Sequence, residues 1–424
     1  MVDKTTGEVL IIGGGISGIS AAVEIAEFGH QVTLIEREAS LGGRVSGSNK
    51  YFPKLCPPYC GLEIYYKRIR SNPNIKFITL AEVTKIDGAV GNFTVSVKIA
   101  PRYVNGKCTG CNECVAVCPI ERPNSFNYGL NNTKAVYLPH EMAMPLRYVI
   151  DNKVCLGDEC AKCVEVCKYD AIELSMKPSD LQLHADAVIV ATGWKPYDAR
   201  KIDHLHFGQY KNVITNTMME RLASPNGPTN GEILRPSDGK KVESVAFVQC
   251  AGSRDENHLP FCSSVCCLAS LKQATYINEY NPEAKAYIFY IDLRAPGRNE
   301  DFLQQRQKEE YLSLIKGKVA EIQEDPNSGD LTVVAEDIYS QTKYRQKVDL
   351  VVLATGMNPT MSDEEIPFTA AQDKYGFFLD DQTSDNGIYF VGCAKTPTDV
   401  SSCIKDANSV ALKALQCIAR KEKS

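Results

Sequence analysis

Cysteine carries the most evident chemistry in this sequence, because 17 of the 424 residues are cysteines and many are closely spaced. A first group follows the pattern Cys-x2-Cys-x2-Cys-x3-Cys-Pro and comprises Cys108, Cys111, Cys114 and Cys118. A second follows Cys-x4-Cys-x2-Cys-x3-Cys and comprises Cys155, Cys160, Cys163 and Cys167. Three closely spaced thiolates can surround one face of a [4Fe–4S] cluster, while the fourth cysteine points to a neighbouring cluster.

The two groups together predict an inserted two-cluster ferredoxin, because the first is the run found in bacterial ferredoxins. Crossed pairing assigns one [4Fe–4S] cluster to Cys108, Cys111, Cys114 and Cys167. It assigns the other to Cys118, Cys155, Cys160 and Cys163. The spacing supports Cys155 least, since four residues separate it from the next cysteine and Lys168 replaces the usual proline. Zinc is the alternative metal, although it favours paired Cys-x2-Cys sites and has no use for the third cysteine of each run.

A third group of cysteines has irregular spacing and comprises Cys250, Cys262, Cys266 and Cys267. We expect Cys262 and Cys266, four residues apart, to share one face of a helix. Four thiolates gathered there suit a third [4Fe–4S] cluster. The alternative is that some are small core residues, because free cysteine is readily buried. His258 is at most a hydrogen-bond donor behind such a cluster.

A strand, a glycine turn and a helix near the N-terminus form the framework that has to position these cysteines. Glu8–Ile12 is an apolar run typical of a buried strand, and a Gly-x-Gly-x-x-Gly turn follows at residues 13–18. Ile19–Phe28 then predicts an amphipathic helix, and Gln31–Ile35 a second strand that ends at Glu36. This order is that of a dinucleotide-binding fold.

Each glycine of the turn has a predicted role. Gly13 permits the tight turn, Gly15 lets the backbone approach a pyrophosphate, and Gly18 packs the helix against the strand. The N–H groups at the helix N-terminus would face the phosphates. Glu36 stands where it can hydrogen-bond an adenosine ribose.

Further segments favour FAD over NAD at this site. Gly42-Gly43-Arg44 follows the acidic residue, as in flavoproteins of the disulfide-reductase and thioredoxin-reductase type. Val188–Gly193 and Val351–Gly356 resemble the paired strand-to-turn segments of that superfamily. Gly387–Cys393 resembles its second flavin fingerprint, and the helix predicted next would direct its N-terminus at the isoalloxazine ring. The residues predicted to contact FAD are Gly13, Gly15, Ile16, Ser17, Gly18, Glu36, Arg37, Gly43, Arg44, Ala191, Thr192, Gly193, Gly356, Gly392 and Cys393.

The third cysteine group lies where a nicotinamide loop would be expected. Val242–Gln249, Cys267–Tyr280 and Ala286–Leu293 predict a strand, a helix and a strand that resemble the second dinucleotide domain of the same superfamily. The turn at Cys250–Asp255 lacks the second and third glycines, so its backbone cannot easily cradle a pyrophosphate. We therefore interpret Asp292 as structural.

The sequence thus predicts an α/β fold, a Rossmann-type FAD fold like that of disulfide and thioredoxin reductases, with an inserted two-cluster ferredoxin domain. Residues 1–100 are the first part of the FAD domain and 101–175 the insertion. Residues 176–240 are the second part of the FAD domain with a linker. The cysteine-bearing second domain takes 241–345, and the last part of the FAD domain takes 346–424.

Composition narrows the classes of function. A hydrophobic fraction of 44% and a charged fraction of 23% are those of a soluble globular protein. The net charge of −5 and the lack of a basic tract argue against nucleic acid as a partner. No apolar run is long enough for a signal peptide or a membrane span, so we expect a cytoplasmic protein with reduced thiols. Membrane contact would then come only through partners.

The five remaining cysteines have less specific patterns. Cys56 and Cys60 could form a redox pair, bind a cluster or pack, because their spacing fits no usual flavin dithiol. Cys393, Cys403 and Cys417 are expected to be buried small residues. Cys393 is the best exception, because it should lie near the flavin.

Three segments together resemble the A subunits of heterodisulfide reductases, and still more the A subunit of the quinone-interacting membrane-bound oxidoreductase complex of sulfate reducers. They are Tyr51–Ile64, Ala191–Ala199 and Gln249–His258. The larger heterodisulfide reductase subunits carry additional iron–sulfur regions, which favours the quinone-interacting complex here. The resemblance implies electron flow between menaquinol and adenylylsulfate reductase. It also implies two partners from the same complex, a homologous flavoprotein (the B subunit) and a haem-bearing membrane protein (the C subunit), with the chain peripheral on the inner face of the cytoplasmic membrane.

These cofactors together indicate an electron-transfer subunit, with no catalytic side chain predicted. FAD takes two electrons and can release them singly, whereas each cluster carries one. We therefore expect FAD to be the branching centre, with flavin-based confurcation as a hypothesis. The alternatives are a bifurcating protein like the A subunits of heterodisulfide reductases and a stand-alone NAD(P)H-dependent disulfide reductase. The altered second turn argues against the last.

Overall fold

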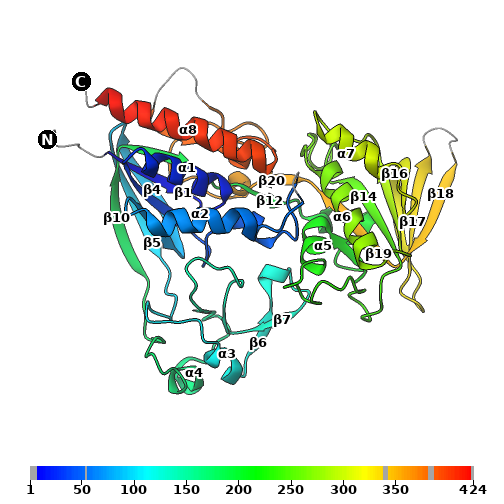
Figure 1. The fold of residues 1–424 in the computed structure, drawn as a ribbon, viewed down its shortest axis with the longest axis horizontal. Coiled ribbons are helices and arrows are strands. Elements are labelled where there is room, and N and C mark those ends of the chain that lie inside the picture. Colours follow the sequence, from blue (N-terminus) through cyan, green and yellow to red (C-terminus); the bar gives the residue numbers. More distant parts are fainter. Residues whose placement is uncertain (1–6, 53–54, 338–341, 381–385, 422–424) are drawn as a thin grey trace.

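The computed structural model describes residues 7–52, 55–337, 342–380 and 386–421, and Figure 1 shows how its parts are arranged. Segments from both ends of the chain build a first domain at the left of that view. A second domain lies at the right, and the insertion lies below the first. Within these residues, no helix is both long and apolar enough to cross a membrane.

The first domain is built on a five-stranded parallel sheet with strand order β21-β11-β1-β2-β3. Its strands are β1 (Glu8–Ile12), β2 (Gln31–Glu36), β3 (Ile75–Thr79), β11 (Ala187–Val190) and β21 (Ile388–Phe390). They are apolar runs because both faces of a parallel sheet are covered. The predicted assembly of this sheet from separated segments is therefore what the structure shows.

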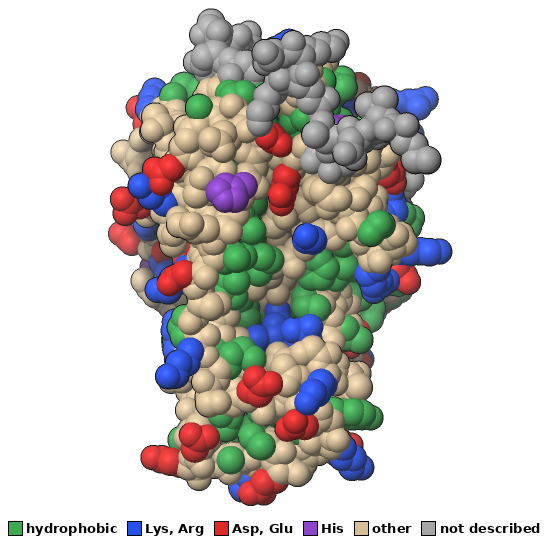
Figure 2. Space-filling model, turned by 90° about the vertical axis from the view of Figure 1, so that its left-hand side faces the viewer, with side chains coloured by type: hydrophobic (Ala, Val, Ile, Leu, Met, Phe, Trp, Pro, Cys, Tyr) green, Lys and Arg blue, Asp and Glu red, His purple; other side chains and the backbone are tan. Residues whose placement is uncertain are grey.

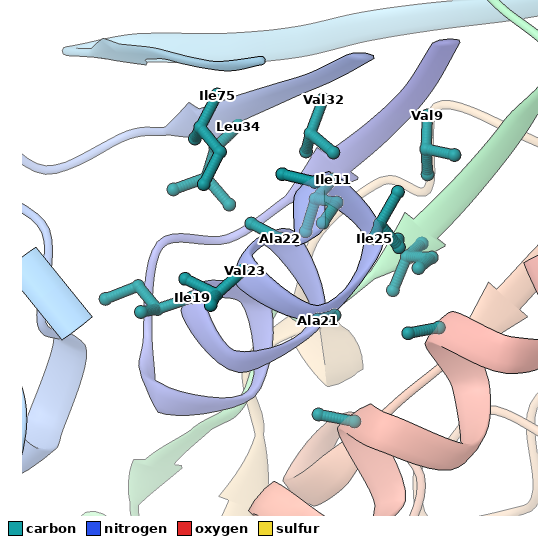
Figure 3. Packing of buried hydrophobic residues seen from close by; sticks show 14 of the residues in the cluster. Val9, Ile11, Ile19, Ala21, Ala22, Val23, Ile25, Val32, Leu34 and Ile75 are labelled. Atoms are coloured by element: carbon teal, nitrogen blue, oxygen red, sulfur yellow. The ribbon is translucent and has the colours of Figure 1, made fainter. Parts of the chain in front are cut away.

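Three helices cover one face of this sheet. They are α1 (Ile16–Glu27), α2 (Tyr59–Ser71) and α8 (Val400–Lys421). Ile11, Val32 and Leu34 point from the strands toward α1 (Figure 3). Small residues such as Ala21 and Ala407 lie in the same core cluster and let α1 and α8 pack closely. Short 3-10 helices of this domain are η1 (Gly43–Gly47), η6 (Thr360–Asp363) and η7 (Gly392–Ala394).

A three-stranded antiparallel sheet covers the other face, with strand order β10-β5-β4. Its strands are β4 (Ala81–Ala89), β5 (Asn92–Ile99) and β10 (Ser179–Ala185). Leu10 and Val188 from the parallel sheet share a buried cluster with Val95 of β5. Because β5 and β10 are neighbours, residues 100–178 leave and re-enter the first domain at one place.

Those residues form the insertion, which has little regular structure. Its elements are α3 (Glu113–Val117), β6 (Glu121–Pro123), η2 (Ser125–Asn127), β7 (Asn132–Lys134), β8 (Val136–Tyr137), β9 (Val149–Ile150), η3 (Gly157–Glu159) and α4 (Lys162–Glu165). A small core around Val136, Ile150 and Ile172 holds them, and several cysteines pack against it. In Figure 2 the insertion is the narrow lower end, and basic and hydrophobic side chains gather above it.

The second domain has a seven-stranded sheet with strand order β13-β19-β14-β15-β16-β17-β18. Its strands are β13 (Val213–Thr215), β14 (Ser244–Ala251), β15 (Lys285–Tyr290), β16 (Leu312–Glu324), β17 (Leu331–Asp337), β18 (Lys343–Val348) and β19 (Leu350–Thr355). Its helices are α5 (Asn216–Leu222), α6 (Cys266–Tyr280) and α7 (Asn299–Arg306). The strands from β13 to β16 are parallel, as in a dinucleotide fold, and β16 to β18 are antiparallel.

The structure corrects two predicted boundaries of this domain. Both β13 and α5 precede residue 241, and β19 follows residue 346, yet all three belong to the second domain. The reason is burial, since every residue of β19 is buried between β13 and β14. The domains are joined by the pair β12 (Trp194–Pro196) and β20 (Met357–Pro359). The 3-10 helices η4 (Ala199–Lys201) and η5 (Asp203–Leu205) follow β12.

Candidate functional site

A cavity of about 1350 Å³ lies where the three parts of the chain meet. Its wall includes Gly13 and Glu36 of the first domain, Phe126 of the insertion, and Thr217 and Lys272 of the second domain. Ordinary ligand pockets enclose about 300–1,000 Å³, so this one has room for a ligand as large as a dinucleotide. It lies at the carboxyl ends of β1 and β2, where α/β sheets bind such ligands.

Most of the residues predicted to contact FAD line this cavity. They are Gly13, Gly15, Ile16, Ser17, Glu36, Arg37, Gly43, Arg44, Ala191, Thr192, Gly193 and Cys393. Segments that are far apart in sequence therefore meet around one space, and their positions fit the predicted role.

The glycine turn combines tight packing with an open edge. A Cβ on Gly13 would collide with the carbonyl oxygen of Ala191, and one on Gly18 would collide with the carbonyl oxygen of Gly13. By contrast, the nearest atom to a Cβ on Gly15 would be Cα of Gly43, 3.9 Å away. Since α1 begins directly after Gly15, its unpaired N–H groups are available to an anion here.

Two neighbouring backbone N–H groups hold the Glu36 side chain at the cavity wall. Its Oε2 accepts a hydrogen bond of 2.7 Å from the Gly14 N–H, and its Oε1 accepts one of 2.7 Å from the Glu38 N–H. Burial raises the pKa of Glu36, while these two N–H groups act in the opposite direction. Each carboxylate oxygen retains acceptor capacity for a ligand hydroxyl.

Two buried polar atoms in the wall lack hydrogen-bond partners within the described part of the chain. They are Oγ1 of Thr192 and Oε1 of Gln273, and both residues line the cavity. Buried polar groups are rarely left unpaired, so the wall fits a polar ligand. Arg44 adds a cation, whose guanidinium lies 5.0 Å from the ring of Trp194.

Three predicted contacts, at Gly18, Gly356 and Gly392, do not line the cavity. Gly18 packs α1 against the turn, which is also the role expected from the sequence. A Cβ on Gly356 would collide with Oγ of Ser253, so this glycine serves packing in the second domain. The N–H of Gly392 donates a hydrogen bond of 2.8 Å to Asp406. These three glycines therefore have packing or hydrogen-bonding roles and do not contact the cavity.

The first predicted cluster set surrounds one small pocket in the insertion. Its wall contains Cys108, Cys111, Cys114 and Cys167. Burial, followed by the neighbouring Cys108 and Cys111 thiols, raises the pKa of Cys114 to about 12. The N–H of Ala171 lies 3.4 Å from Sγ of Cys167. The four cysteines that the crossed pairing assigns to one cluster thus line the same pocket, and the pairing itself stays a prediction.

Members of the second set also lie together. Burial, Cys155 and Cys118 raise the pKa of Cys163 to about 11. The N–H of Gly157 lies 3.4 Å from Sγ of Cys155, a type of contact that tunes iron–sulfur centres. In the part of the chain that the structure covers, no three His, Cys, Asp or Glu side chains stand together as they would around a single metal ion.

The third cysteine group joins a bulged strand end to the start of a helix. Cys250 lies in β14 beside a register shift, with a left-handed φ of 58°. Burial and the Cys267 and Cys262 thiols raise its pKa. The prediction that Cys262 shares a helical face with Cys266 is wrong, because α6 begins only at Cys266. Ser264, with a left-handed φ of 65°, lies between them and keeps this segment out of a right-handed helix.

The turn that replaces a nicotinamide loop is filled by protein groups. Arg254 donates a hydrogen bond of 2.9 Å to Oδ2 of Asp292, which lies two residues after the end of β15. A Cβ on Gly252 would lie 2.5 Å from the ring of Tyr197. His258, also nearby, contacts the Tyr197 hydroxyl at 2.8 Å. The structural role expected for Asp292 agrees with this ion pair.

No sequence motif indicated the ion pair that lies in the cavity wall. Nζ of Lys272 lies 2.9 Å from Oε1 of Glu220, and both side chains are at most 10% exposed. Gln273 donates a hydrogen bond of 2.6 Å to the same carboxylate. The feature of the sequence that could have indicated this ion pair is a lysine and a glutamine directly after Leu271, in the middle of a helix. The structure shows that the middle of this helix is buried.

The insertion also contributes residues that no motif indicated. Phe126, Tyr137 and His140 line the cavity. Burial, together with Arg221, lowers the pKa of His140 to about 4. These contacts join segments far apart in the chain, so only the assembled fold reveals them.

Cys56 and Cys60 remain outside the cavity wall, although Tyr51 beside them lines it. Burial and a hydrogen bond with Cys56 raise the pKa of Tyr51 to about 12. Cys60 is exposed near the start of α2. Between them and Tyr51, Pro53 and Lys54 of the resemblance segment lie outside the described residues. The three interpretations of this pair stay open.

Comparison with known sequences supports the prediction that the glycine turn in the cavity wall binds FAD. Residues 8–70 match the FAD dependent oxidoreductase family. The iron–sulfur A subunit (type 2) of the CoB–CoM heterodisulfide reductase of Methanopyrus kandleri is 40% identical over 429 residues, covering 98% of this chain and 65% of that protein. The A subunit of the H(2):CoB-CoM heterodisulfide,ferredoxin reductase of Methanothermobacter marburgensis is 37% identical over 419 residues, covering 96% of this chain and 63% of that protein. The chain thus spans a little under two thirds of these relatives.

Solved structures support the fold class. Thioredoxin reductase of Lactococcus lactis matches with a TM-score of 0.54 at 14% identity, covering 98% of this chain and 100% of that one. Thioredoxin reductase of T. acidophilum matches with a TM-score of 0.52 at 14% identity, covering 97% and 99%. The predicted α/β flavoprotein fold, with an FAD-dependent oxidoreductase domain, is confirmed.

Proposed function

Because its similarity to heterodisulfide reductase A subunits runs along nearly the whole chain, we propose that this protein is an electron-transferring flavin and iron–sulfur oxidoreductase subunit. The observation that carries the proposal is the shared cavity. Its wall joins the glycine turn, the insertion with two cysteine groups, and α6, which begins at the third cysteine group. The cavity therefore adjoins both the part of the chain that carries the first two cysteine groups and the helix that begins at the third, although none of these cysteines lines it.

Side chains of this cavity would hold FAD at its polar parts. The N–H groups after Gly15 would bind the pyrophosphate, and Glu36 the adenosine ribose. Thr192 would use the hydroxyl that otherwise lacks a partner. Bound FAD supplies the conversion between electron pairs and single electrons, and the three cysteine groups would hold the one-electron carriers.

The Lys272–Glu220 pair is suited to holding a proton at the cavity wall. Electron transfer to a flavin is accompanied by proton uptake, and water reaches a buried site poorly. Tyr276 lies 3.2 Å from Oε2 of Glu220, so a hydrogen-bonded path leads away from Lys272 Nζ. We propose that Lys272 donates and regains a proton here.

The stand-alone NAD(P)H-dependent reductase is disfavoured by the second domain. Arg254 and Asp292 form an ion pair across the turn. Cysteines also occupy the turn, where glycines would be needed to let the backbone approach a pyrophosphate. We therefore propose that electrons enter and leave through partner proteins.

Two proposals for those partners follow from different observations. The segments 51–64, 191–199 and 249–258 favour the quinone-interacting complex. Electrons would then pass between menaquinol and adenylylsulfate reductase through the homologous flavoprotein and the haem-bearing membrane protein, at the inner face of the cytoplasmic membrane. Flavin-based confurcation would extend that role. The 37–40% identities to heterodisulfide reductase A subunits favour a bifurcating protein of that kind instead.

Anaerobic purification with counts of iron, sulfide and FAD tests the proposal. We expect one FAD and about twelve iron atoms per chain, four for each of three clusters, with no bleaching of the flavin by NADH. About eight iron atoms with rapid bleaching would contradict it and favour the nicotinamide reductase. Co-purified proteins then decide the partners: a haem-bearing membrane protein selects the quinone complex, and thiol–disulfide reductase subunits select the other.

A further inference from the structure

Cys393 and Cys403 form a buried pair of thiols in the wall of the cavity. Their Sγ atoms lie 3.8 Å apart, and both residues line the cavity while being only 6% and 5% exposed. Cys393 belongs to η7 and Cys403 to the first turn of α8. A disulfide needs a distance of about 2.05 Å, so an approach of roughly 1.8 Å would join them.

The surroundings make the two thiols chemically unequal. A hydrogen bond from Cys393, with help from Ser17, lowers the pKa of Cys403. Conversely, the contact with Cys403 and burial raise the pKa of Cys393. The start of α8 also favours a negative charge at Cys403. Cys403 is therefore the more acidic thiol of the pair, and Cys393 holds its proton more tightly.

The pair lies between the flavin cavity and the third cysteine group. Met357 completes a buried cluster with both thiols, and Val265, directly before Cys266, packs against it. Gly392, with a φ of 64°, holds the turn that presents Cys393. A two-electron carrier at this point would stand beside both kinds of proposed redox centre.

We propose that Cys393 and Cys403 are a redox-active dithiol that exchanges an electron pair with the FAD. The FAD partner rests on the proposed function, whereas the dithiol rests on the geometry of the two thiols. Once Cys403 has lost its proton to solvent, oxidation breaks the S–H bond of Cys393 and forms the Cys393–Cys403 S–S bond. The two electrons and the Cys393 proton pass to oxidised FAD, which becomes the reduced flavin anion.

Thiol trapping in the full-length chain tests the dithiol itself. The protein is equilibrated anaerobically in buffers with different ratios of reduced to oxidised dithiothreitol. It is then alkylated and digested, and its peptides are analysed by mass spectrometry. We expect peptides carrying the two residues to become cross-linked as the buffer becomes more oxidising. The same transition should persist in Cys417→Ala, because Cys417 is buried on α8 about 21 Å further along the helix. Alkylation of both Cys393 and Cys403 at every ratio would overturn the proposal.

Reductive titration tests the exchange with FAD. Wild type should take up two electrons per chain more than Cys403→Ser before the flavin and clusters are fully reduced, whereas Cys417→Ala should match wild type. Equal uptake by wild type and Cys403→Ser would overturn the exchange. If the purified chain holds no FAD, the proposed function fails, and thiol trapping still decides whether the dithiol exists.

Discussion

At the scale of the residue, burial changes the pKa of side chains around the cavity, and the effect can be measured at His140. Its pKa of about 4 means that the imidazole stays neutral in the folded protein where the unfolded chain, with a pKa near 6.5, takes up a proton. Between these values the unfolded state binds more protons, so the free energy of unfolding falls as the pH drops. The loss is up to about 1.4 kcal/mol per pH unit.

The variant His140→Gln cannot take up that proton. Chemical denaturation between pH 7 and pH 5 should show wild type losing stability more steeply than His140→Gln, with the gap widening below a pH of about 6.5. Exposed His184 is the matched control, and His184→Gln should follow wild type. Parallel curves for wild type and His140→Gln would show that the imidazole is protonated in the fold.

At the scale of the element, patterns with local causes were predictable and boundaries set by long-range pairing were not. The glycine turn identified β1, α1 and β2 because each glycine has a local steric reason to be there. Nothing local assigns β19 to the second sheet, since its neighbours β13 and β14 come from distant parts of the chain. The helical position expected for Cys262 failed for a local reason, the left-handed Ser264, which a spacing of four residues does not reveal.

The turn that joins β1 to α1 gives a prediction at this scale. A methyl group on Gly18 would collide with the carbonyl oxygen of Gly13 and push α1 away from the sheet. We expect Gly18→Ala to lose about 1–3 kcal/mol of stability and most of its FAD, measured by denaturation and by flavin absorbance. Gly106→Ala, where the nearest atom would be 3.7 Å away, should leave both unchanged. Normal FAD content in Gly18→Ala would contradict the proposed role of this turn.

At the scale of the whole molecule, the convergence of three parts on one cavity is the feature that motifs could not foresee. The ferredoxin run and the glycine turn each indicate a cofactor, but neither says that Phe126 and Lys272 share a wall. A buried arginine links the parts. Arg221, on α5 and 1% exposed, donates a hydrogen bond of 2.8 Å to Asn127 of the insertion. Its guanidinium lies 4.5 Å from the ring of Phe126.

Replacing Arg221 by leucine should therefore loosen the insertion from the second domain without unfolding either. Losing hydrogen bonds from a buried charge costs about 1.5–3 kcal/mol each, and Asn127 would be left without this donor. We expect faster hydrogen exchange at residues 124–128 in Arg221→Leu, together with weaker FAD retention but unchanged iron. Arg200→Leu, at an exposed ion pair with Asp198, should leave the exchange as in wild type. If residues 124–128 exchange at the wild-type rate in Arg221→Leu, the insertion is held by its own core and its position at the cavity does not depend on α5.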